Sequence, residues 1–166
     1  HESIMEDRIR YELPLGLFGN FFGSALVRKR LDRTFRYRHR VLARDLAVHS
    51  RAPEQALRVL VSGSSGLVGR ALVSFLQSGG HDVHRLVRHP PATEREIEFD
   101  SEKGFRHPSR MEGFDAVIHL AGEPIAKGRW TKAKKRRIRD SRVPFTRRLA
   151  EALVLLHKPP SAFISG

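Results

Sequence analysis

The 166 residues contain no cysteine, which excludes a disulfide framework and any zinc site built on cysteine. No apolar run approaches the roughly 18–20 residues that a helix needs to span a bilayer. The sequence begins HESIMEDRIRYELP, without an initiator methionine and without the basic-then-apolar order of a signal peptide. These absences predict a cytoplasmic protein with no membrane span, and we expect the chain to be a fragment of a longer one.

Acidic residues are scarce relative to basic ones. Lys and Arg total 31 against 18 Asp and Glu, a net charge of +13 that raises the question of an anionic partner. The densest basic stretch, residues 127–148, has eleven Lys or Arg and one acid, Asp140. Its aromatic residues, Trp130 and Phe145, are not interleaved with the basic ones as a platform, and no nucleic-acid motif is present. A solvated helix face is therefore favoured, and nucleic acid is not the expected partner.

Three of the 13 glycines fall in one informative segment, LRVLVSGSSGLVG at 57–69. A short apolar strand runs into Gly63, Gly66 and Gly69, and an amphipathic helical pattern follows at once. Gly63 allows a tight turn, Gly66 leaves the backbone N–H groups open to a pyrophosphate, and Gly69 lets the helix lie close to the sheet. This order predicts dinucleotide binding at a helix N-terminus, and a purely structural glycine turn is the alternative. The residues expected to bind the cofactor here are Gly63, Ser65, Gly66, Leu67, Val68 and Gly69.

Strands and helices alternate from residue 56 onward. The patterns predict strands at 57–62, 82–87, 96–99, 115–120 and 162–165, helices at 66–78 and 131–157, and a loop at 101–113. Pro144 is expected to kink or split the second helix, because its ring clashes with the carbonyl of Asp140. The alternation predicts an α/β fold, a Rossmann-type parallel sheet with helices on both faces, here incomplete.

Residues that follow the later strands complete the predicted site. Arg88, after the second strand, suits a 2′-phosphate and indicates NADP, with NAD as the alternative. Asp100, after the third strand, is either a hydrogen-bond acceptor for the adenine amino group or a loop cap. The small-residue turn Leu120, Ala121 and Gly122 ends the fourth strand, where a ribose could approach the backbone.

Residues 1–50 cannot enclose a core of their own. Alternation at 8–13 predicts a strand, and helical spacing at roughly 18–48 predicts one long helix. Because a strand and a helix do not form a domain, residues 1–50 are interpreted as the end of a domain, 51–55 as a linker, and 56–166 as the first half of a dinucleotide-binding domain.

Together these segments resemble a known family. The runs VSGSSGLVGRAL, LVRHP, GFDAVIHLAGEPIAKGRWT and IRDSRVPFTRRLA are similar to the atypical extended short-chain dehydrogenase/reductases of the NAD-dependent epimerase-like group, some labelled cell-division inhibitors. The resemblance implies an NAD(P)-dependent oxidoreductase or epimerase with an unidentified small-molecule substrate. RIRYELPLG and VRKRLDRTFRYRH resemble the end of a START-like (polyketide-cyclase-like) domain, which implies a hydrophobic ligand for the intact domain.

The acid–base pair of short-chain dehydrogenases is missing. Those enzymes use a Tyr with a Lys four residues later, whereas Tyr11 and Tyr37 precede the glycine turn and neither has that Lys. We therefore assign no catalytic residue and expect this fragment to be inactive. A non-enzymatic dinucleotide-binding regulator and a basic nucleic-acid-binding module are the alternative functions.

Overall fold

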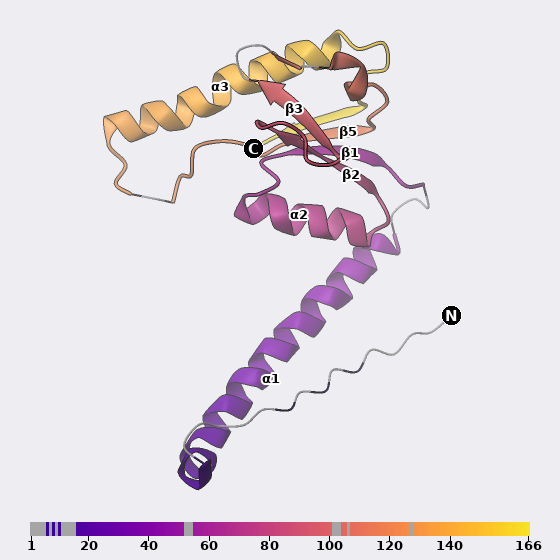
Figure 1. The fold of residues 1–166 in the computed structure, drawn as a ribbon. Coiled ribbons are helices and arrows are strands. Elements are labelled where there is room, and N and C mark those ends of the chain that lie inside the picture. The colour runs from indigo at the N-terminus through magenta and orange to yellow at the C-terminus, as the bar shows by residue number, and fades with distance from the viewer. Residues whose placement is uncertain are drawn as a thin grey trace. The chain divides into compact units, whose positions relative to one another are not determined.

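The protein is described by a computed structural model that covers Glu6, Arg8, Arg10 and residues 16–51, 55–100, 104–105, 107–126 and 128–166. The chain divides into two compact units, His1–Arg51 and Ala52–Gly166. In the first unit a 34-residue helix α1, Gly16–His49, confirms the helix predicted at 18–48 (Figure 1). Most of the strand predicted at 8–13 and of the linker predicted at 51–55 lies outside the described residues. The START-like origin of residues 1–50 stays a prediction.

Along α1, the half-buried apolar side chains lie on one stripe that includes Val27, Leu31 and Phe35. Leu26 and Tyr37, in contrast, are more than three-fifths exposed. Among the described residues, no helix combines the length and the apolar character that crossing a membrane requires.

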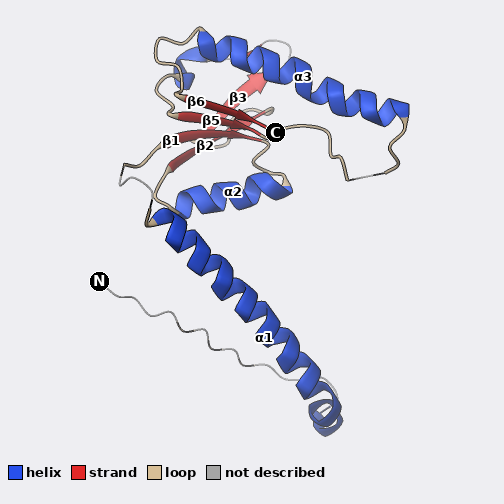
Figure 2. Ribbon diagram, turned by 180° about the vertical axis from the view of Figure 1, so that it is seen from behind, coloured by secondary structure: helices blue, strands red, loops and turns tan. Residues whose placement is uncertain are grey.

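The second unit is built on a six-stranded sheet in the order β4-β3-β2-β1-β5-β6 (Figures 1 and 2). Its strands are β1 Arg58–Ser62, β2 Asp82–Val87, β3 Glu96–Asp100, β4 Gly104–Phe105, β5 Ala116–His119 and β6 Ala162–Ser165. All neighbouring pairs are parallel except the β3–β4 pair, which is antiparallel. The predicted α/β class is confirmed, and the carboxyl ends of the parallel strands meet at one edge of the sheet.

Helices cover both faces of this sheet. α2, Leu67–Ser78, lies on one face and α3, Lys132–Val154, on the other (Figures 1 and 2). Alternation along β1 explains the two cores: Val59 and Val61 pack with Val73 of α2, while Leu60 packs with Leu149 of α3. A strand buried on both faces reads as a continuous apolar run, as the sequence indicated.

The prediction of a loop at 101–113 is wrong. β4 lies within that range, and so does a 3-10 helix η1, Pro108–Met111. Phe105 of β4 packs on Phe99, with ring centroids 4.6 Å apart, and Met111 is fully buried. Because polar and glycine residues predominate in this stretch, the prediction overlooked two apolar side chains that complete the core under α3.

The second helix is not split at Pro144, because α3 runs through this residue as one helix of 23 residues, while the predicted kink stays a prediction. Pro144 has no N–H to donate to the carbonyl of Asp140, but both residues are exposed, so water can satisfy that carbonyl. The prediction of a split ignored which side of the helix faces solvent.

Candidate functional site

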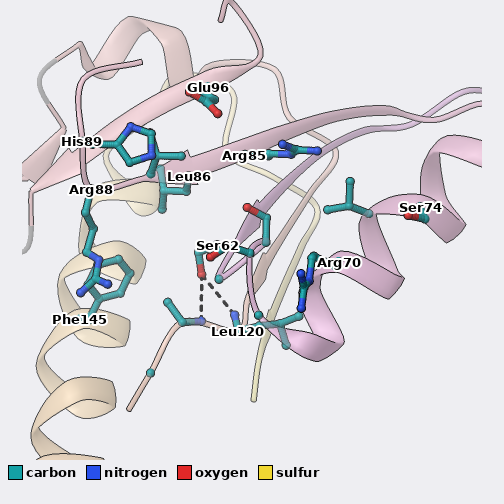
Figure 3. A pocket seen from close by; sticks show the side chains of 18 of the residues that line it. Ser62, Arg70, Ser74, Arg85, Leu86, Arg88, His89, Glu96, Leu120 and Phe145 are labelled. Atoms are coloured by element: carbon teal, nitrogen blue, oxygen red, sulfur yellow. Dashed lines mark hydrogen bonds between the residues drawn. The ribbon is translucent and has the colours of Figure 1, made fainter. Parts of the chain in front are cut away.

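A cleft of about 980 Å³ opens at the carboxyl edge of the sheet, between the ends of β1, β2 and β5 and the start of α2 (Figure 3). Four kinds of group surround it: the glycine turn, polar side chains of α2, charged side chains of β2, and the turn after β5. Of the predicted site residues, Gly63, Ser65, Gly66, Arg88, Leu120, Ala121 and Gly122 line this cleft. The topology thus brings together segments that are up to 59 positions apart.

Two glycines of the turn, Gly63 and Gly69, leave no space for a Cβ. Gly63 has φ +70°, and a Cβ there would lie 2.6 Å from the carbonyl carbon of Leu120. A Cβ at Gly69 would lie 2.1 Å from the carbonyl oxygen of Gly63. Gly63 therefore allows β1 and β5 to end side by side, and Gly69 allows α2 to begin directly against the turn.

The first turn of α2 faces this cleft without a cap. Gly66 is the N-cap residue, and no side chain accepts from the first N–H groups of the helix. The first intrahelical bond runs from the Arg70 N–H to the Gly66 carbonyl, at 2.9 Å. The side chains of Leu67 and Val68 are 83% and 65% exposed and do not line the cleft, so these residues can act only through their backbone N–H groups. Unpaired N–H groups and the helix dipole make this an anion-binding end.

Basic side chains dominate the charged lining of the cleft. Arg70 of α2, Arg85 of β2 and Arg88 after β2 are all exposed and line it (Figure 3). Glu96 is the acidic residue in that lining. This surplus of positive charge favours a ligand with several phosphate charges.

Ser62 connects the two turns that form the base of the cleft. Its buried Oγ accepts hydrogen bonds from the N–H groups of Leu120 at 3.2 Å and Ala121 at 3.4 Å (Figure 3). The same Oγ lies 2.6 Å from Nδ1 of His119, which is its partner in the β1–β5 register. One polar residue at the end of β1 therefore contacts three consecutive residues at the end of β5.

His119 is fully buried and is held in the neutral form. Burial lowers the pKa of His119 below its ordinary value, and the positive charge of Arg142 lowers it further. The imidazole stacks on the ring of Phe145, with centroids 4.7 Å apart and planes at 13°. Nε2 of His119 has no hydrogen-bond partner among the described residues. His119 is therefore a packed strand residue that also pairs with Ser62.

Glu123 attaches the turn after β5 to α3. Its Oε1 accepts from Nζ of buried Lys134 at 2.7 Å, and its N–H donates to Oγ of Ser141 at 2.9 Å. Its carbonyl accepts from a guanidinium N–H of Arg142 at 3.2 Å. The hydrogen bond from Lys134 is the main reason that the pKa of Glu123 lies below its usual value. A Cβ on Gly122 would lie 2.8 Å from the Arg142 guanidinium, so the turn also fits closely over that side chain.

Asp100 is exposed at the carboxyl end of β3, opposite Gly104 of β4, and does not line the cleft. Its predicted contact with adenine stays a prediction. Sequence reasoning missed Ser62, Arg85 and Phe145, which do line the cleft. A polar residue that ends an apolar strand, with another polar residue at the end of the paired strand, is the signal that could have identified Ser62.

No tyrosine lines the cleft in the part of the chain that the structure describes. Tyr37 lies in α1 of the first unit and is 66% exposed, while Tyr11 lies outside the described residues. No cluster of three His, Asp or Glu side chains suitable for a metal occurs among the described residues.

Comparison with known proteins decides the family. The model of the NAD dependent epimerase/dehydratase family matches residues 59–165, which include all the strands and helices of the second unit except the first residue of β1. The chain belongs to this family. The predicted Rossmann-type architecture and the predicted epimerase-like relationship are thereby confirmed for the second unit.

Curated epimerase family proteins are similar to more than half of this chain. Epimerase family protein Mb2239 of Mycobacterium bovis is 41% identical over 95 residues, which are 57% of this chain and 32% of the relative. Human epimerase family protein SDR39U1 is 36% identical over 110 residues, which are 65% of this chain and 36% of the relative. The chain therefore spans about a third of the length of these relatives.

Solved structures of the family agree with the fold. A nucleoside-diphosphate sugar epimerase from Corynebacterium glutamicum is 36% identical with a TM-score of 0.63, covering 79% of this chain and 27% of that one. Human SDR39U1 (isoform 2), solved with NADPH, is 32% identical with a TM-score of 0.54, covering 66% of this chain and 36% of that one.

Proposed function

We propose that this chain is the NADP(H)-binding portion of a short-chain dehydrogenase/reductase-type oxidoreductase or nucleotide-sugar-epimerase-like protein. The observation that carries the proposal is the uncapped N-terminus of α2, which opens into a cleft lined by Arg70 and Arg88. The relative solved with NADPH supports the choice of cofactor.

The residues present fit a dinucleotide. A Cβ on Gly66 would lie 3.2 Å from the Gly63 carbonyl oxygen, so any residue larger than glycine narrows the space over the helix N-terminus. The N–H groups of Leu67 and Val68 would hold a pyrophosphate there, because they have no intrahelical acceptor. The turn Leu120–Gly122 would receive a ribose, because its three residues line the cleft beside the glycine turn.

Arg88 supports NADP over NAD. It is exposed at the end of β2, lines the cleft, and belongs to no ion pair that the structure shows among the described residues. A planar guanidinium binds a phosphate with two donors, whereas the adenosine ribose of NAD offers only hydroxyl groups there.

A bound nicotinamide would supply hydride-transfer chemistry. The described residues bind and orient: the α2 N-terminus holds phosphate charge, Arg88 selects the 2′-phosphate, and the turn after β5 positions the ribose. For the whole protein, the proposed substrate is a small molecule that exchanges hydride with the cofactor.

The test is a titration of the chain with NADPH and NADH, wild type against Arg88→Ala. We expect NADPH to bind more tightly than NADH, and the substitution to remove about 1–3 kcal/mol of that preference while leaving NADH affinity nearly unchanged. Arg95→Ala is the matched control, because Arg95 is an exposed arginine in the same β2–β3 connection that does not line the cleft. An unchanged NADPH/NADH ratio in Arg88→Ala would refute the assignment of Arg88.

A further inference from the structure

Parallel pairing brings Ser62 and His119 together at the end of the two central strands. They are partners in the β1–β5 register, and alternation places both on the α3 face of the sheet with Leu60 and Val117. Both are buried, with exposed fractions of 1% and 0%. Buried polar groups need hydrogen-bond partners, and Ser62 and His119 supply one to each other at the end of a mainly apolar core.

The protons of this cluster can be assigned by counting donors and acceptors. A hydroxyl has one hydrogen and two lone pairs. The N–H groups of Leu120 and Ala121 are donors only, so they occupy the lone pairs of the Ser62 Oγ. The hydroxyl hydrogen is then directed to Nδ1 of His119, which must be an unprotonated acceptor. His119 therefore carries its single proton on Nε2.

This arrangement determines how the turn after β5 is held. The Leu120 N–H is shared between the Ser62 carbonyl and Oγ, both at 3.2 Å, whereas the Ala121 N–H has the Ser62 Oγ as its acceptor in the structure. Ser62 also directly precedes Gly63, the first residue of the glycine turn. One hydroxyl thus joins the turn proposed to hold the pyrophosphate to the turn proposed to hold the ribose.

We propose that Ser62, oriented by His119, is a positioning residue for the dinucleotide, because its hydroxyl holds the two backbone amides that shape the ribose turn. The inference rests on the proposed dinucleotide function of the cleft. His119 acts by accepting the hydroxyl hydrogen, and stacking on Phe145 fixes the plane of the imidazole. Neither side chain takes part in the chemistry of the cofactor.

The experiment measures NADPH and NADH affinity of the 166-residue chain and its Ser62→Ala, Ser62→Thr and Val59→Ala variants, each with a thermal melt. Ser62→Ala should weaken both dinucleotides by the same factor, about tenfold, because one buried hydrogen-bond acceptor is lost. Ser62→Thr keeps the hydroxyl and should restore affinity. Val59→Ala creates a hole at the other end of β1, in the α2 core, and should lower the melting temperature without changing affinity.

Two further readouts separate positioning from general stability. Amide hydrogen exchange of Leu120 and Ala121, measured without cofactor, should be faster in Ser62→Ala only. ¹⁵N NMR of wild-type His119 should show the Nε2–H tautomer. His119→Asn keeps an acceptor near the position of Nδ1 and should bind more tightly than His119→Gln, which places its amide near Nε2.

The outcomes separate the proposed dinucleotide function from the positioning role of Ser62. If wild type binds neither dinucleotide, the proposed function fails and the positioning role fails with it. If wild type binds and Ser62→Ala binds equally well, or if Val59→Ala loses as much affinity as Ser62→Ala, the positioning role alone is refuted.

Discussion

Substitution of Gly66 by Asp separates phosphate binding from folding. Gly66 has φ −71° and ψ 171°, the extended conformation usual for an N-cap residue, so an L side chain is compatible with the backbone. Its Cβ would lie 3.2 Å from the Gly63 carbonyl oxygen, which must move by a few tenths of an ångström. The Asp carboxylate would accept from the N–H groups of the first helical turn, the same groups proposed to bind pyrophosphate.

Opposite effects on stability nearly cancel in this variant. Asp is a better N-cap than Gly by a few tenths of a kcal/mol, and its charge at the helix N-terminus adds about 0.3–1 kcal/mol. The tight contact with Gly63 costs about as much. We therefore expect the free energy of unfolding to stay within about 1 kcal/mol of wild type.

Cofactor binding should change far more. Two like charges 4 Å apart repel by about 1 kcal/mol in water and about 4 kcal/mol at the effective dielectric near a protein surface. Gly66 is exposed, so an intermediate value of about 3 kcal/mol applies, on the order of a hundredfold in affinity.

The control is Gly66→Ser, which caps the same N–H groups without a charge. Its affinity for NADPH should fall by roughly tenfold at most, the free energy of one hydrogen bond. The assay is a fluorescence titration with NADPH, alongside urea denaturation of each variant. If the Asp variant bound NADPH within threefold of the Ser variant while both remained folded, the helix N-terminus would not be the phosphate site.

Three further predictions test the parts that support the cleft. Gly69→Ala should lower the free energy of unfolding by about 3 kcal/mol or more, because a Cβ 2.1 Å from the Gly63 carbonyl oxygen forces the turn and helix apart; urea denaturation measures this, and a loss below about 1 kcal/mol would contradict it. Because His119 resists protonation when folded but not when unfolded, the unfolded state binds more protons below the ordinary pKa of 6.5. Stability should then fall as pH drops below that value, by up to about 1.4 kcal/mol per unit for this proton. In His119→Asn, denaturation curves recorded on either side of that pH should lack the part of the stability loss that comes from His119. The same pH dependence in wild type and variant would refute the prediction. Lys134→Met removes the main cause of the low pKa of Glu123, so the carboxyl should titrate closer to its ordinary value, as followed by ¹³C NMR. An unchanged titration would show that the ion pair does not form in solution.

Local patterns accounted for the main elements of the second unit. The apolar run before Gly63 predicted β1 within one residue, and helical spacing after Gly66 predicted α2 within one residue, because each pattern depends on neighbours along the chain. The segment 101–113 defeated the same reasoning. Phe105 and Met111 are isolated apolar residues whose burial depends on Phe99 and on the core under α3.

What the sequence determined by itself is the glycine turn, the strand–helix alternation and the basic residue after β2, since each can be recognised within a few consecutive positions. Tertiary structure alone decided that Ser62 meets His119 across 57 positions, that Lys134 reaches Glu123, and that Asp100 stays outside the cleft. The physical reason is that register between parallel strands and the close packing of α3 on the sheet arise from burial of distant residues together.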